Sequence, residues 1–159
     1  MRRMLLSLGV CSAALAEPPR PPLLSADGLY PLALDQAAQV FRQCSRGAPE
    51  PGDDLWAPTR SEISELEAAL PAYMAGRKKA SLRTPPETGQ YLRQYVGFTR
   101  NGTRQIYGNF FHSSIRQIAD QMSHPFVGPV VVCDGGPAFW GIVYNPATKA
   151  FEEPQFNGP

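Results

Sequence analysis

The sequence predicts an α+β domain in which two to three helices pack on one antiparallel sheet of about five strands. Helical periodicity dominates the first half of the chain, whereas the second half consists mainly of short β-rich runs separated by turn residues. The chain also contains 17 prolines and 14 glycines, which favour short elements joined by firm turns.

The first predicted helix spans residues 35–46. Asp35 can cap its N-terminus and Gly47 can end it. Apolar residues recur at helical spacing and define one face, namely Ala37, Val40, Phe41 and Cys44. We therefore expect Cys44 to point into the core.

A loop over residues 48–58 is expected to lead into a second helix. Thr59 and Glu62 have the spacing of a capping box. An apolar stripe then continues to about Gly76 and comprises Ile63, Leu66, Leu70 and Tyr73. Pro71 lacks a backbone N–H, so we expect it to kink the helix or to end it early.

A β-hairpin is predicted over residues 90–98 and 103–111, which are rich in Tyr, Val, Ile and Phe. The two runs flank Asn101-Gly102, and both of these residues tolerate the positive φ of a tight hairpin turn. Further along we expect a short helix at 114–123, a fully buried strand at 130–133, strands at 138–144 and 149–156, and turns at 134–137 and 145–148.

Aromatic residues are numerous in these strands. The alternation of side chains places Trp140, Ile142 and Tyr144 on one face and Phe139, Gly141 and Val143 on the other. If helices cover only one face, aromatic residues on the other face would form an exposed partner surface, unless the Pro-rich segment near the N-terminus covers them.

The N-terminus has the three parts of a secretory signal peptide. Arg2 and Arg3 precede an apolar run, and a small-x-small pattern predicts cleavage between Ala16 and Glu17. The apolar run is too short to span a bilayer. We therefore expect a signal peptide at 1–16, a Pro-rich extended segment at 17–31 and a single domain at 32–159, located in the periplasm or outside a bacterial cell, with no transmembrane segment after cleavage.

Composition argues against several classes of partner and cofactor. The chain has 15 Lys+Arg and 14 Asp+Glu, and cleavage removes two of the arginines, which leaves 13 against 14. A nearly neutral domain has no general attraction to nucleic acid. Two histidines, the absence of a Cys-x-x-Cys pair and the absence of a phosphate-binding loop lead us to expect no metal and no cofactor.

Cleavage would leave two cysteines, Cys44 and Cys133, and an even number in an oxidising compartment predicts a disulfide. The alternative is two separate buried thiols. In a catalytic alternative, Cys133 or Ser113 would act as the nucleophile with His112 or His124 as the base. No signature of a known hydrolase surrounds these residues, so no catalytic residue is expected.

The C-terminal half resembles a group of small uncharacterised exported proteins of Gram-negative bacteria. The resemblance rests on residues 94–97, 106–110, 131–136, 139–141, 145–148 and 156–158. It implies export and one domain, and no functional residue follows from it.

Together these features predict an exported, non-enzymatic binding protein, of the inhibitor or immunity type, that acts on a protein partner in the cell envelope. A small secreted hydrolase and an envelope protein that binds a small ligand are the alternatives.

Overall fold

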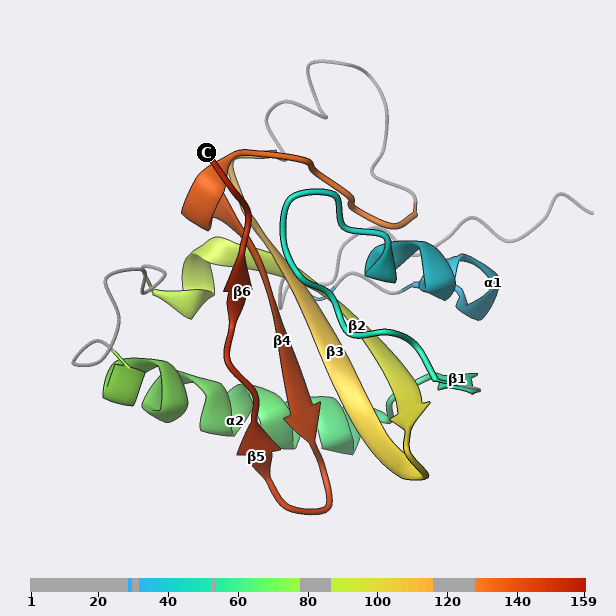
Figure 1. Cartoon of the computed structure of the whole chain (residues 1–159). Helices are drawn as coiled ribbons and strands as arrows, with labels where there is room; N and C mark the ends of the chain where they lie inside the picture. Colours follow the sequence, from blue (N-terminus) through green and yellow to red (C-terminus); the bar gives the residue numbers. More distant parts are fainter. Residues whose placement is uncertain (1–28, 30–31, 53, 78–86, 116–127) are drawn as a thin grey trace, which may run out of the picture.

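The computed structural model describes residues 29, 32–52, 54–77, 87–115 and 128–159. The predicted signal peptide with its cleavage site Ala16/Glu17, nearly all of the Pro-rich segment, and most of the helix predicted at 114–123 lie outside these residues. Within them the predicted α+β class is confirmed. The sheet is antiparallel and has six strands in the order β1-β2-β3-β4-β5, with β6 also paired to β4 (Figure 1).

The long hairpin predicted around Asn101-Gly102 is confirmed. Strands β2 (Tyr91–Arg100) and β3 (Thr103–His112) pair along their whole length. Asn101 and Gly102 have φ values of 52° and 71°, the left-handed conformation that a tight hairpin turn requires. β4 (Phe139–Asn145) continues the sheet on the other side of β3.

The edges of the sheet are formed by short strands. The run predicted as one strand at 149–156 is divided into β5 (Ala150–Phe151) and β6 (Gln155–Phe156). Pro154 lies between them and has no N–H to contribute to a ladder. At the opposite edge, β1 (Leu55–Trp56) lies where a loop was predicted, and the Trp56 ring covers Gly97, where no side chain would fit.

Helix α2 (Arg60–Arg77) crosses one face of the sheet (Figure 1). Its predicted capping box is present, since the Glu62 N–H donates to Thr59 Oγ1 (3.2 Å) and the Thr59 N–H donates to Glu62 Oε2 (2.8 Å). Of the kink or early end expected at Pro71, the early end is wrong, because the helix continues to Arg77. Pro71 is exposed, so water can satisfy the carbonyl that loses its donor.

The first helix is shorter than predicted. α1 (Leu34–Ala37) tightens into the 3-10 turn η1 (Ala38–Phe41), and the chain then leaves the helix. The Gln43 side chain donates to the Val40 carbonyl (2.7 Å), in place of the backbone N–H that a further turn would supply. Cys44 therefore lies beyond the helix and is exposed, and its expected burial is wrong.

Both faces of the sheet are covered. The predicted alternation is confirmed, because Trp140, Ile142 and Tyr144 pack under α2 with Leu66, Leu70 and Met74. On the other face, Val143 and Tyr107 pack with Val40 and Phe41 of η1. On that face Phe98, Tyr107 and Phe111 are buried and Phe139 is half-buried, so the aromatic surface predicted for the case of one open face is absent from the described part of the chain.

Candidate functional site

Residues 128–134, here called the stapled segment, cross the face of the sheet opposite α2. Their predicted assignment as a buried strand is wrong, since no strand pairs with them and Val131 and Cys133 are exposed. The apolar pattern has a different cause. Val130 and Val132 pack against Leu92 and Phe111 of the sheet, whereas Val131 between them is exposed.

Three buried side-chain amides hold this segment, and we call them the amide ladder: Gln94 of β2, Asn109 of β3, and Asn157 just after β6. Gln94 and Asn109 are opposite each other in the β2–β3 pairing, which places both on one face. All three are at most 2% exposed. Buried amides are costly unless their hydrogen bonds are made, so their partners define the role of the ladder.

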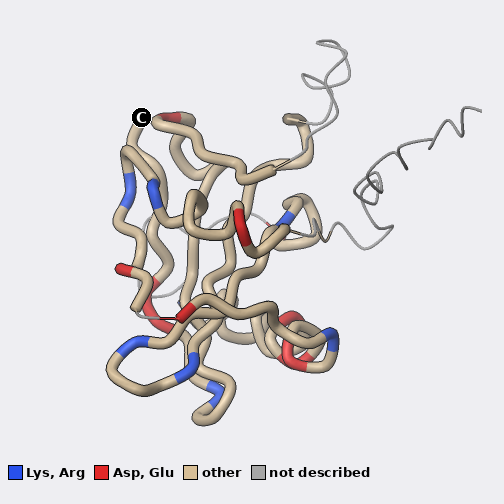
Figure 2. The backbone as a smooth tube through the Cα atoms, turned by 90° about the vertical axis from the view of Figure 1, so that its right-hand side faces the viewer, with Lys and Arg blue, Asp and Glu red and all other residues tan. Residues whose placement is uncertain are grey.

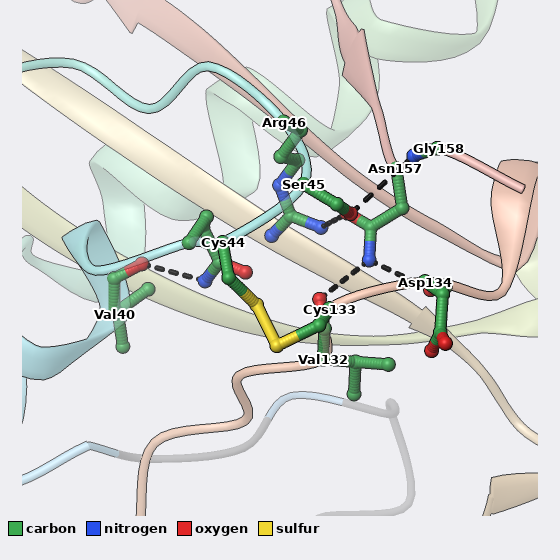
Figure 3. Close-up of a disulfide and its surroundings, with 10 residues drawn as sticks. Val40, Cys44, Ser45, Arg46, Val132, Cys133, Asp134, Asn157 and Gly158 are labelled. Carbon is green, nitrogen blue, oxygen red and sulfur yellow. Dashed lines mark hydrogen bonds between the residues drawn. A yellow bond between two sulfur atoms is a disulfide. The ribbon is translucent and has the colours of Figure 1, made fainter.

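The ladder bonds to every second residue of the segment. Gln94 donates to the Gly128 carbonyl (2.7 Å) and accepts from the Val130 N–H (3.0 Å), and Asn109 donates to the Val130 carbonyl (2.9 Å). Asn157 donates to the carbonyls of Val132 (2.6 Å) and Asp134 (2.9 Å) (Figure 3). Side chains thus take the place of a neighbouring strand, although the chain bends at Cys133, where the one Asn157 amide nitrogen reaches both the Val132 and the Asp134 carbonyl.

Arg46 sets the orientation of the ladder. Arg46 is 9% exposed. Its guanidinium donates to Asn157 Oδ1 (2.6 Å), Asn109 Oδ1 (2.5 Å) and the Tyr107 hydroxyl (3.4 Å). Arginine has only donors, so both asparagines must turn their oxygens toward it. Their NH₂ groups then face the segment, where carbonyls accept.

The acceptors around Arg46 are all neutral. No carboxylate of the described residues forms an ion pair with it. Burial raises the pKa of Tyr107, and the nearby Arg46 charge opposes that rise in part, so the phenol stays protonated at neutral pH. Gly141 leaves the room for this phenol, because a Cβ there would lie 2.3 Å from Tyr107 Oη.

A disulfide fixes the other side of the segment. The predicted Cys44–Cys133 bond is present, with the two Cα atoms 4.9 Å apart and 89 residues apart in sequence (Figure 3). Both cysteines are exposed rather than buried. Cys44 and Arg46 belong to one loop, so this loop holds the segment both covalently and through the ladder.

The segment and α1 present apolar surface. Leu34 is 49% exposed and Val131 is 40% exposed, and they are the two large hydrophobic residues so exposed in the described part of the chain. A Cβ at Gly128 would lie 3.5 Å from Gln36 Oε1 of α1, so the two elements are neighbours. A rigid irregular segment beside exposed apolar side chains is typical of a protein-binding surface.

The contacts of the candidate catalytic residues give the catalytic alternative little support. Cys133 is in the disulfide and has no thiol to ionise. His112 Nδ1 lies 2.9 Å from Ser114 Oγ and 3.3 Å from the Ser114 N–H in a tight turn, whereas the Ser113 N–H donates to the Gln90 carbonyl. His124 lies outside the described residues.

Charge does not define a site either. Figure 2 shows Lys and Arg as well as Asp and Glu spread along the backbone. Glu62 and Glu67 of α2 pair with Arg104 (3.5 Å) and Arg93 (2.6 Å), and Glu65 pairs with Lys149. Among the residues that the structure describes, no three His, Cys, Asp or Glu side chains are grouped to hold a metal, and no helix is long and apolar enough to cross a bilayer.

The sequence matches no protein-family model, no curated protein and no solved structure. The resemblance to small exported proteins therefore stays a prediction. Sequence reasoning assigned no role to the amide ladder or to Arg46. One signal was present, since Gln94 and Asn109 occupy inward positions of otherwise apolar strands, where a polar residue needs a buried partner.

Proposed function

We propose that the chain is an exported, non-enzymatic binding protein whose protein partner docks on the stapled segment and the adjoining α1. The inhibitor or immunity type fits best, with a cell-wall enzyme or a toxin as the partner. One observation carries the proposal: a disulfide and three buried amides hold a segment that still exposes Val131.

Preorganisation explains why such an arrangement suits binding. An exposed loop normally loses conformational freedom when a partner orders it, and that loss weakens association. Here the ladder and the disulfide have already ordered the backbone. The disulfide is also consistent with an oxidising, exported location.

Site-specific photo-crosslinking tests the proposal. A photoreactive phenylalanine analogue is placed at Val131 and, as a matched control, at Ala147, which is exposed in the turn between β4 and β5. In envelope extract supplemented with a muramidase, we expect one discrete adduct from position 131 and none from position 147. Equal labelling at both positions, or none at either, would contradict the proposal.

Charge substitutions give an independent readout. With the photoreactive residue at position 131, Leu34→Asp should abolish the adduct. Without it, Val131→Asp and Leu34→Asp should each abolish the inhibition of the captured enzyme, because each places a carboxylate in the apolar contact. Ala147→Asp should leave both unchanged. The thermal unfolding of the three variants should match that of the parent, since all three positions are exposed.

A further inference from the structure

Buried side chains hold the backbone of the stapled segment on both sides of Val131. The carbonyl before it, that of Val130, accepts from Asn109 (2.9 Å). The carbonyl after it, that of Val132, accepts from Asn157 (2.6 Å). Val131 itself is 40% exposed, and within the described part of the chain its own N–H and C=O make no hydrogen bond. One apolar side chain is thus presented to solvent between two fixed neighbours.

The disulfide adds a covalent attachment just beyond this point. Cys133 is bonded to Cys44, and the chain bends there (Figure 3). Each side of the Val131–Val132 peptide bond is therefore attached to the domain by contacts that do not depend on that bond. Cutting the bond would leave both new ends in place.

We propose that the stapled segment is the reactive segment of a serine endopeptidase inhibitor. The Val131 side chain would occupy the specificity pocket of the enzyme, and the Val131–Val132 bond would lie at its nucleophile. The inference rests on the proposed function and specifies the inhibited enzyme. A small apolar pocket, as in elastase-type enzymes, is the complement of a compact, branched and uncharged side chain.

The attachments explain why the enzyme would be inhibited instead of consuming the segment. The serine hydroxyl attacks the Val131 carbonyl carbon, and its proton passes through the enzyme's histidine to the Val132 nitrogen as the C–N bond breaks. Val131 is then an ester of the enzyme, and a free peptide would lose its amine and be hydrolysed. Here Asn157 and the disulfide keep the Val132 amine beside the ester. The amine re-forms the peptide bond faster than water attacks, and the proton returns to the serine.

The residues before Val131 favour tight association. Pro129 fixes one backbone angle, and Gln94 bonds to both the Gly128 carbonyl (2.7 Å) and the Val130 N–H (3.0 Å). This part of the segment therefore loses little conformational freedom when an enzyme docks on it.

A specificity swap tests the inference without knowledge of the natural enzyme. The oxidised protein is titrated into an elastase-type and a trypsin-type serine endopeptidase, each assayed with a chromogenic peptide. We expect the parent to inhibit the elastase type. Val131→Arg should lose about 100-fold in affinity for it and should inhibit the trypsin type, whose pocket contains a carboxylate. Ala147→Arg, the same change at an exposed turn position, should alter neither inhibition.

Weakening one attachment tests the role of the ladder. Asn157→Asp keeps an acceptor for Arg46 but has no N–H for the Val132 carbonyl. We expect the elastase-type enzyme to cleave this variant between residues 131 and 132 about 10-fold faster than the parent, the factor that one hydrogen bond represents. Mass spectrometry after reduction locates the cut. Asn145→Ala, which removes a cap of the β4–β5 turn, is the control and should be cleaved at the parent rate.

Three outcomes would overturn the inference. The first is that the parent does not inhibit the elastase type and Val131→Arg does not inhibit the trypsin type. The second is cleavage of the parent as fast as that of a free peptide of residues 128–135. The third is inhibition that Val131→Arg leaves unchanged, which would place the contact elsewhere. If crosslinking at position 131 captures an enzyme that is not a peptidase, the docking surface stands and the endopeptidase inference fails.

Discussion

Replacement of Asn157 tests whether the amide ladder holds the stapled segment. Asn157→Ala removes two neutral hydrogen bonds to the segment and one charge-assisted bond from Arg46. At about 1 kcal/mol for each neutral bond and about 2 kcal/mol for the charged one, the loss in the free energy of unfolding is about 4 kcal/mol. The melting temperature should fall by about 10 °C or more. Urea unfolding of the oxidised protein measures the loss in the free energy of unfolding.

The isosteric variant Asn157→Asp distinguishes the two roles of the side chain. A carboxylate keeps an acceptor for Arg46 and adds an ion pair, but it has no N–H for the carbonyls of Val132 and Asp134. We expect a net loss of about 1–2 kcal/mol and faster amide exchange in the segment. If this variant is as stable as the parent and its exchange is unchanged, Asn157 serves only Arg46 and the ladder argument is refuted. Asn145→Ala, which removes a half-buried turn cap, is the control and should cost about 1 kcal/mol.

Three further predictions concern the disulfide and the dependence of stability on pH. Replacing Cys44 and Cys133 by serine should lower the free energy of unfolding by about 4 kcal/mol, and an unchanged urea midpoint would contradict this. The Thr59 N–H and hydroxyl lower the pKa of Glu62 from 4.5, so its stabilising effect is present above pH 4.5 and is lost as pH falls through the lowered pKa. Glu62→Gln should flatten that acid slope in circular dichroism, and an unaltered slope would count against the cap. Burial, and secondly a neighbouring carboxylate, raise the pKa of Tyr95 well above 10, so the unfolded chain ionises first and stability falls as pH rises beyond 10. Tyr95→Phe should reduce this alkaline loss, and equal loss in both proteins would argue against it.

Local chemistry explains why some elements could be predicted from the sequence. The hairpin follows from Asn101-Gly102, since few residue pairs adopt two successive positive φ angles at little cost. The start of α2 follows from Thr59 and Glu62, whose side chains bond within one turn. Such signals act over a few residues, so no tertiary contact can easily override them.

The stapled segment shows why other elements could not be predicted from the sequence. Three successive valines favour a buried strand, and the segment is indeed hydrogen-bonded at every second residue. The partner, however, is a set of side chains from positions outside the segment, including Asn157, which lies 25 residues beyond Val132. Residue pattern reports which conformation a segment prefers, and it carries no information on which group supplies the hydrogen bonds.

The disulfide was predicted from cysteine number and compartment, and its surroundings were predicted wrongly. Periodicity placed Cys44 on the buried face of a helix, but the helix ends after Phe41 because the Gln43 side chain bonds to the Val40 carbonyl. The bond therefore joins two exposed loops. The Gln43 side chain bonds to the carbonyl that the Cys44 N–H would use in a longer helix, which is a competition that apolar periodicity does not report.

An arginine at position 46 suits the hydrogen bonds that the stapled segment requires. The carbonyls of the segment need hydrogen-bond donors. An asparagine that turns its NH₂ group toward them turns its oxygen to the other side, where a buried donor must bond to that oxygen. A carboxylate in the ladder would neutralise Arg46 but would leave those carbonyls without donors. A lysine would supply a point charge without the planar fork that reaches two amides at once. A buried arginine with only neutral acceptors is thus the arrangement that turns both asparagines, Asn109 and Asn157, toward the stapled segment.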